Sequence, residues 1–189
     1  MIKIIAGKHK NKSIYTPKNL NTRPTSARLK ETIFSMLKHS NNIKLNIENI
    51  NVLDLFAGSG AFGLECISRG CNSCVFIDNN TEAINTINKN IRKLKEEENC
   101  KVVKNNAVQP LKNISNINLC FIDPPYKINN LIKVIDNWVS SGCIDEEAIY
   151  ILEKNSTNNI QLAKRFELLD SRKQGITEII FFKSLSSAK

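Results

Sequence analysis

The sequence predicts an α/β protein built around a mostly parallel β-sheet that carries helices on both faces. From residue 51 onward, short β-rich apolar runs alternate with amphipathic stretches, and the stretch 81–95 has the period of a helix. Strands and helices in this rhythm form βαβ units, whose helices cover the sheet. The chain has 189 residues, 41% hydrophobic and 24% charged, which suits one ordinary globular domain.

The first 50 residues follow a different pattern. Short strands are expected at 2–6 and 13–15 on either side of a basic turn, and a Thr-Ser pair can cap a helix over about 25–39. We therefore expect a small basic N-terminal extension, residues 1–45, docked on a main domain of residues 46–189.

The main domain shows seven short apolar runs, each bounded by turn or polar residues. The expected strands are 52–56, 74–77, 101–103, 119–122, 149–152, 166–169 and 178–182. The last two runs are separated by little more than Gly175 and polar residues, which favours a hairpin with an antiparallel strand near the sheet edge. Between the second and third runs, apolar residues recur at helical spacing, with Asn80 or Thr81 as the N-cap.

Basic residues are concentrated at the N-terminus. Residues 1–38 hold nine Lys or Arg against the single acid Glu31, whereas the rest of the chain is nearly balanced. A basic segment of this kind is typical of a surface that meets phosphates, although a solvated basic arm would look the same. The candidate residues for this contact are Lys8, Lys10, Lys12, Arg23, Thr25 and Arg28, and the family resemblance given below implies that they would contact RNA.

Other features narrow the class of protein. No apolar run is long enough for a membrane span and the N-terminus lacks a signal-peptide core, so we expect a cytoplasmic protein without a membrane partner. The six cysteines lie mostly in apolar runs, which favours buried thiols over disulfides. Cys71 and Cys74 form a CxxC, but no second ligand pair has zinc spacing, so no metal is expected. We expect a monomer.

A glycine-rich loop is the strongest nucleotide-type signal. Gly58, Gly60 and Gly63 match G-x-G-x-x-G after an apolar run and before a helical pattern, which is the context that such a motif requires. Glycines there let backbone N–H groups approach a ligand closely. The structural alternative is a tight turn between strand and helix that binds nothing.

Asp78 ends the second run of the main domain, 20 residues after Gly58. A carboxylate at the tip of this strand can accept hydrogen bonds from both hydroxyls of a ribose. Its alternative role is N-capping of the following helix, beside Asn79 and Asn80.

The motif that discriminates among nucleotide-binding enzymes is Asp123-Pro124-Pro125-Tyr126, which follows an apolar run. The prolines fix φ and lack N–H donors, so their carbonyls remain available to a base amino group. An exocyclic amine attacks poorly because its lone pair is delocalised, and holding both N–H bonds on Asp123 and the Pro124 carbonyl would localise that lone pair. Tyr126 would stack on the extruded base. An ordinary rigid loop is the alternative.

Taken together, these blocks resemble the bacterial 16S rRNA guanine-N2 methyltransferase family over almost the whole chain. The matching segments are residues 54–60, 123–126, 23–25 with 30–34, the opening 4–7, and the Asn106-Ala107 pair. Three positions depart from the family pattern: Asn11 stands in place of glycine, Ala27 in place of an acid, and Ser35 in place of asparagine.

The resemblance implies a Rossmann-like class I fold with a seven-stranded sheet, and S-adenosyl-L-methionine as methyl donor. It implies 16S rRNA, free or within an assembling small subunit, as the partner, and guanine N2 as the acceptor. The implied catalytic residues are Asp123, Pro124, Pro125 and Tyr126. The implied cofactor-binding residues are Asp54, Phe56, Ala57, Gly58, Ser59, Gly60, Asp78, Asn79, Asn106 and Ala107.

Three rival functions fit the residues less well. An NAD-dependent dehydrogenase needs a proton-transferring group, but both histidines, His9 and His39, precede the α/β region. An adenine-N6 methyltransferase of DNA or RNA uses the same Asp-Pro-Pro-aromatic chemistry, but the DNA enzymes usually carry a recognition domain for which this chain has no room. A non-catalytic RNA-binding domain would leave residues 54–126 without a role.

Overall fold

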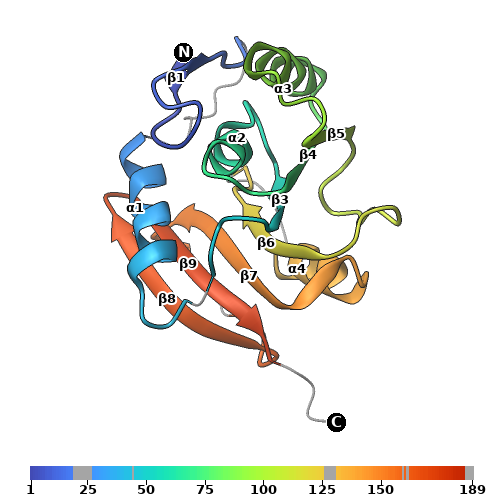
Figure 1. Ribbon diagram of the computed structural model, residues 1–189. Helices are drawn as coiled ribbons and strands as arrows, with labels where there is room; N and C mark the ends of the chain where they lie inside the picture. Colours follow the sequence, from blue (N-terminus) through green and yellow to red (C-terminus); the bar gives the residue numbers. More distant parts are fainter. Residues whose placement is uncertain (19–26, 44, 126–130, 159, 161, 186–189) are drawn as a thin grey trace.

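A seven-stranded sheet organises the structure, a computed structural model that describes residues 1–18, 27–43, 45–125, 131–158, 160 and 162–185 (Figure 1). The elements are β1 (Ile2–Lys3), β2 (Ser13–Ile14), α1 (Ala27–His39), β3 (Asn51–Leu55), α2 (Ala61–Ser68), β4 (Ser73–Asp78), α3 (Thr81–Leu94), β5 (Cys100–Lys104), β6 (Ile117–Ile122), α4 (Leu131–Ser140), β7 (Ile144–Asn155), β8 (Phe166–Gln174) and β9 (Thr177–Ser184).

The strand order is β5-β4-β3-β6-β7-β9-β8. The first five strands run parallel, whereas β9 is antiparallel to both β7 and β8. The α/β fold with a seven-stranded, mostly parallel sheet is therefore confirmed, including the antiparallel hairpin at its edge. The carboxyl ends of β3, β4 and β6 lie side by side at the centre of the sheet, where ligands bind in open α/β folds.

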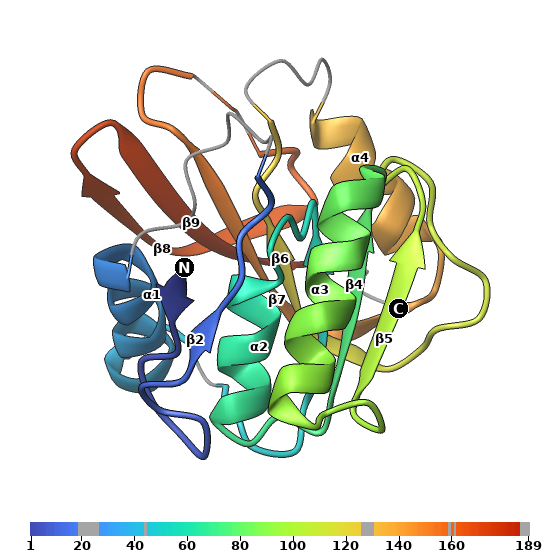
Figure 2. The ribbon, with the colours of Figure 1, turned by 90° about the horizontal axis from the view of Figure 1, so that it is seen from above.

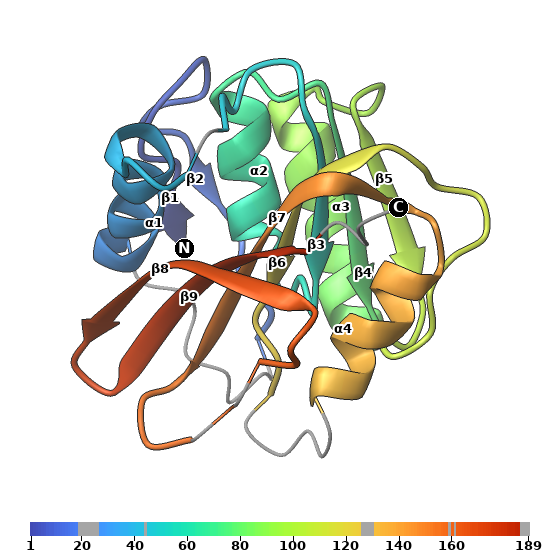
Figure 3. The ribbon, with the colours of Figure 1, turned by 90° about the horizontal axis from the view of Figure 1, so that it is seen from below.

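Alternate residues of the central strands pack into two separate hydrophobic layers. One layer contains Val52 and Phe76 and is covered by α1, α2 and α3, which stand in front of the sheet in Figure 2. The other contains Leu53 and Ile77 and is covered by α4, which is seen from the opposite side in Figure 3. Both faces of the sheet are buried because every central strand is apolar on both sides.

The N-terminal segment packs into the first of these layers. Strands β1 and β2 form a two-stranded antiparallel sheet, and α1 is joined to the main sheet by stacked rings. The ring centroids of Phe34 and Phe62 lie 5.4 Å apart, and those of Phe62 and Phe121 lie 3.9 Å apart. The division into domains at residue 45 stays a prediction.

Some strands differ in length from the sequence expectation. The two N-terminal strands are shorter, because the chain turns at residues 4–12, and β7 and β8 are longer, with 12 and 9 residues. Helix α3 begins and ends within one residue of the expected bounds, and Asn80 is its N-cap. The cap proposed for α1 lies outside the described residues.

The six cysteines are free thiols, and five of them are buried. Burial raises the pKa of Cys71 to about 12 and raises the pKa of Cys74 as well, which keeps both in the thiol form. The expectation of buried thiols rather than disulfides is confirmed. No helix in the described part of the chain is long and apolar enough to cross a membrane.

Candidate active site

Three aspartates expected from separate segments meet at the carboxyl edge of the sheet. Asp54 is in β3, Asp78 ends β4, and Asp123 follows β6 directly. Leu55 of β3 pairs with Ile77 on one side and Ile122 on the other, so Asp78 and Asp123 are at one level and Asp54 lies two residues before that level on the strand between them. The site is therefore formed by neighbouring strands.

Asp54 is the buried member of this group, with 2% of its surface exposed. Its Oδ2 accepts a hydrogen bond of 3.0 Å from the Gly63 N–H, which fixes the start of α2 against β3. Burial raises the pKa of Asp54 well above its usual value, the Gly63 hydrogen bond opposes this shift, and the charges of Asp123 and Asp78 add to it.

The glycine-rich loop is held in an unusual backbone conformation between β3 and α2. Phe56, Gly58 and Gly60 all have positive φ, of 60°, 56° and 73°. Such a value is strained for phenylalanine, and strain of this kind often marks a binding site. The Ala57 N–H donates to the Ile77 carbonyl, which ties the loop to β4.

Gly63 has a packing role. A Cβ atom at this position would lie 2.4 Å from the Phe76 ring and 2.5 Å from the Cys74 sulfur, so only glycine lets α2 approach β4 so closely. The third glycine of the motif thus brings helix and strand together, and the first two shape the loop.

Asp78 links the loop to the start of α3. Its Oδ2 accepts from the Gly58 N–H at 2.8 Å and its Oδ1 from the Asn80 N–H at 2.8 Å. The helix cap is Asn80, whose side chain accepts from the N–H groups of Glu82 and Ala83. Asp78 is therefore not the N-cap, and each of its oxygens retains a lone pair for another donor.

The remaining cofactor candidates surround this edge. Asn79 is exposed in the turn before α3, and Ser59 is half-buried in the loop. Asn106 is exposed in the turn after β5, where its Oδ1 accepts from the Val108 N–H. The Ala107 carbonyl accepts from the indole N–H of Trp138 in α4. This hydrogen bond holds the turn after β5 against α4.

The catalytic candidates lie on the neighbouring strand. Asp123 and Pro124 are half-buried and Pro125 is exposed. All three follow β6 at the level where the glycine-rich loop follows β3. Tyr126 lies outside the described residues.

The basic turn between β1 and β2 is more structured than a solvated arm. Lys8 forms an ion pair of 2.8 Å with Glu96, and the His9 ring bonds to the same carboxylate. The Lys12 amine lies 3.0 Å from His9 Nδ1. Lys10 is exposed, and so is Arg28 in the first turn of α1. Arg23 and Thr25 lie outside the described residues.

Two departures from the family pattern can be placed. Asn11 has a φ of 68°, in the left-handed region that asparagine adopts more readily than most residues other than glycine, so the turn keeps its shape without glycine. Ser35 is exposed on α1. Ala27 is the first residue of α1, and nothing in the structure explains why it replaces an acid.

Comparison with known proteins places the chain in a family. Residues 2–183 match the model of the family described as Conserved hypothetical protein 95. The chain belongs to this family. One relative is the Ribosomal RNA small subunit methyltransferase D of Buchnera aphidicola (subspecies Baizongia pistaciae), 33% identical over 84% of this chain and 79% of its own.

A second relative of the same name, from Escherichia coli K12, is 31% identical over 84% of this chain and 77% of its own length. A solved Escherichia coli structure, yhhF, provisionally described as a methyltransferase, superposes with a TM-score of 0.84. It is 26% identical and covers 98% of this chain and 99% of its own. The family resemblance inferred from the sequence is thereby confirmed, and so is the methyltransferase-like fold.

The structure also reveals a site residue that sequence reasoning missed. Asn90 of α3 is completely buried, and its Oδ1 accepts from the Tyr15 N–H at 2.7 Å. Its Nδ2 donates to the carbonyls of Tyr15 and Ser59, each at 3.0 Å. One amide thus joins the N-terminal segment to the glycine-rich loop. The sequence feature that could have identified Asn90 is its place as a polar residue on the apolar face of α3, beside Ile87 and Ile91.

We expect Asn90→Ala to destabilise the protein by about 1–3 kcal/mol, because buried backbone groups lose their partner. It should also weaken cofactor binding, since the Ser59 carbonyl is no longer held. Asn88→Ala is the matched control, because within the described part of the chain the Asn88 amide donates to the Ile84 carbonyl of its own helix. Urea unfolding and calorimetry on both variants provide the measurement, and equal effects would contradict this role for Asn90.

Proposed function

We propose that this protein transfers a methyl group from S-adenosyl-L-methionine to the exocyclic N2 amino group of a guanine in 16S rRNA. The observation that carries the proposal is the alignment of the glycine-rich loop, Asp78 and Asp123 on neighbouring strands of a methyltransferase-like fold. The names of the curated relatives support ribosomal RNA of the small subunit as the substrate. The reaction would take place in the cytoplasm, where ribosomal subunits are assembled.

The residues at the sheet edge fit S-adenosylmethionine. Both oxygens of Asp78 can still accept hydrogen bonds from ribose hydroxyls, since each carboxylate oxygen has two acceptor sites and, among the described residues, one backbone N–H is bound to each. The cofactor carries a sulfonium and an ammonium group, and the neighbouring acids Asp54 and Asp78 suit those positive charges. Asn79, Asn106 and Ala107 follow the adjacent strands, where an adenine would lie. When bound, the cofactor supplies an electrophilic methyl group.

The chain's own contribution to the chemistry is to hold the amine. Asp123 and the Pro124 carbonyl would each accept one N–H bond of the guanine amino group, which localises the nitrogen lone pair and aims it along one line. Asp123 has a stable position because it follows the buried strand β6. Tyr126 remains a prediction from the sequence, as the ring on which the extruded base stacks.

The N-terminal segment would bind RNA next to this site. Lys10 and Arg28 are exposed, and Lys8 is half-exposed although it is paired with Glu96, so all three can reach phosphates. Lys12, Arg23 and Thr25 complete the proposed contact surface. Asn90 fastens the same segment to the cofactor loop, so RNA contacts and the cofactor site are joined by one rigid connection.

Cofactor binding tests the first part of this proposal. We expect the protein to bind S-adenosylmethionine and not NAD, and Asp78→Ala to weaken that binding by a few kcal/mol at most, because charged hydrogen bonds are lost. Asn80→Ala is the control: it removes only the α3 cap, with a loss of about 1 kcal/mol of stability and little change in affinity. Comparable calorimetric affinities for both cofactors, or an unaffected Asp78→Ala, would contradict the assignment.

A further inference from the structure

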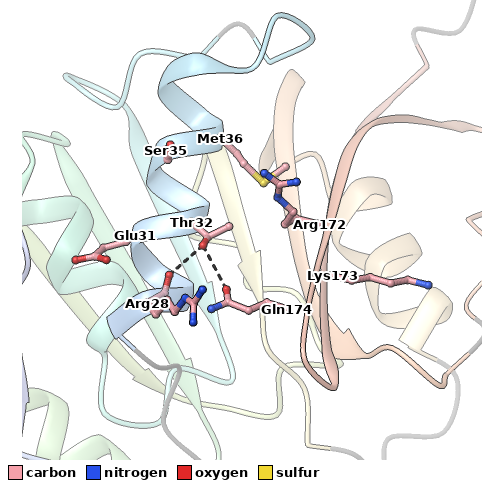
Figure 4. A pocket seen from close by; sticks show the side chains of 8 residues that line it. All are labelled: Arg28, Glu31, Thr32, Ser35, Met36, Arg172, Lys173 and Gln174. Atoms are coloured by element: carbon pink, nitrogen blue, oxygen red, sulfur yellow. Dashed lines mark hydrogen bonds between the residues drawn. The ribbon is translucent and has the colours of Figure 1, made fainter.

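A polar groove separates α1 from the edge strand β8. It has a volume of about 540 Å³ and adjoins a hollow of about 310 Å³, with which it shares Ser35, Met36 and Arg172. The groove is lined by Arg28, Glu31, Thr32, Ser35, Met36, Arg172, Lys173 and Gln174, as Figure 4 shows. Met36 is the only apolar residue among them, so the groove does not suit an apolar ligand.

Strand register places the groove at the catalytic edge of the sheet. Ile122 pairs with Leu152 of β7, so Asp123 is level with Glu153, which pairs with Ile179 of β9. Ile179 pairs in turn with Arg172 of β8. Arg172 is thus at the level of Asp123, three strand spacings away, or about 14 Å.

Two arginines point into the groove. Figure 4 shows the Arg172 side chain directed toward Met36, and the Arg28 side chain beside the pair formed by Thr32 and Gln174, whose Oγ1 and Oε1 atoms are 3.3 Å apart. The ion pairs recorded among the described residues include neither guanidinium. Arg28 also lies in the first turn of α1, where the helix dipole does not favour a cation.

The two other charged residues of the groove point elsewhere. Glu31 extends from the opposite side of α1, and Lys173 extends from β8 away from the helix (Figure 4). In the adjoining hollow, Asp170 accepts a hydrogen bond of 2.7 Å from the Ser40 hydroxyl. The groove between α1 and β8 is therefore positively charged and offers hydrogen-bond donors from both walls.

We propose that this groove binds the phosphodiester backbone of the RNA strand whose target base enters at Asp123. An arginine fork matches phosphate oxygens in two-point hydrogen bonds, and the hydroxyl and amide groups of Thr32, Ser35 and Gln174 suit phosphate and ribose oxygens. The inference rests on the proposed function and extends its RNA-contact surface, which already includes Arg28, to Arg172 of β8 on the side of Asp123 opposite β4. An RNA strand would then be held on both sides of the flipped base.

The test measures binding of a 16S rRNA transcript at several salt concentrations. We expect the double variant Arg28→Gln with Arg172→Gln to weaken binding about tenfold or more, and to lower the slope of log affinity against log salt by about 1 to 2. Arg172→Lys should fall between wild type and Arg172→Gln, because it keeps the charge and loses the fork. Both arginines are exposed, so the variants should fold, which thermal unfolding verifies.

Lys173→Gln is the matched control, because it removes one charge from the adjacent residue, whose side chain extends from β8 away from the helix. It should leave affinity and slope close to those of the wild type. Two results would overturn the groove assignment: wild-type RNA affinity in the double variant, or a loss of affinity in Lys173→Gln as large as that in Arg172→Gln. The proposed function would still stand if the wild-type protein transfers the methyl group to RNA. A wild-type protein that methylates no RNA would overturn both the groove assignment and the proposed function.

Discussion

We expect Asp123→Ala to slow single-turnover methyl transfer by about a hundredfold or more, with cofactor and RNA binding nearly unchanged. Asp123 follows β6 at the level of the glycine-rich loop, and its proposed task is to hold an amino group that arrives only with the extruded base. An amine held by one hydrogen bond keeps more of its lone pair in the ring and rotates off the line of attack. Losing such positioning costs this much in rate.

The measurement is transfer from labelled S-adenosylmethionine to 16S rRNA or reconstituted subunits, with binding measured on the same samples. Asp145→Ala is a suitable control, because Asp145 is an exposed carboxylate on β7 that accepts a hydrogen bond from the Glu147 N–H. The Asp145→Ala variant should transfer the methyl group at the wild-type rate. Near-normal turnover by Asp123→Ala would remove the catalytic assignment, and loss of cofactor binding would show a structural role instead.

The largest loss of stability is expected from Glu65→Ala in α2. The Glu65 carboxylate is completely buried and accepts the N–H groups of Ile5 and Ala6, at 2.8 and 3.0 Å, which dock the N-terminal segment. It also bonds to Arg69 Nε at 2.9 Å and lies 3.8 Å from the amine of Lys30, which is itself fully buried. Removing the Glu65 carboxylate leaves the Lys30 charge buried and uncompensated, which costs about 3–5 kcal/mol of stability.

For a chain of this size, that loss lowers the melting temperature by on the order of 10 °C. Burial lowers the pKa of Lys30 while Glu65 opposes that shift, so the amine depends on this carboxylate. Lys30→Met combined with Glu65→Gln should recover much of the stability, because it leaves no fully buried charge without a partner. Glu31→Ala, an exposed acid on α1, is the control. Equal melting temperatures for Glu65→Ala and Glu31→Ala would contradict this account.

Local sequence patterns were enough to predict most of the sheet. The central strands could be recognised because both of their faces are apolar, and α3 because its apolar residues recur at helical spacing next to a capping asparagine. The loop glycines, Asp78 and Asp123 could be located because each follows an apolar run, and parallel strands bring such positions to one edge. Their chemical roles remain predictions.

Contacts between distant segments could not be predicted in the same way. Glu65 was recognisable only as the one charged residue in the apolar helix α2, and its partners Ile5, Ala6 and Lys30 are 35 to 60 positions away in the sequence. Arg172 belongs to an edge strand, where exposed charge is ordinary, and only the register with β9 and β7 brings it level with Asp123.

The central claim, methylation of guanine N2 in 16S rRNA, is tested most directly by nucleoside analysis. Purified protein is incubated with labelled S-adenosylmethionine and small-subunit RNA or subunits from a strain in which the gene is deleted, and the RNA is then digested and separated. The account predicts label in N2-methylguanosine at a single site, and none with Asp123→Ala. Label in N6-methyladenosine, or no label in any nucleoside of wild-type reactions, would contradict it.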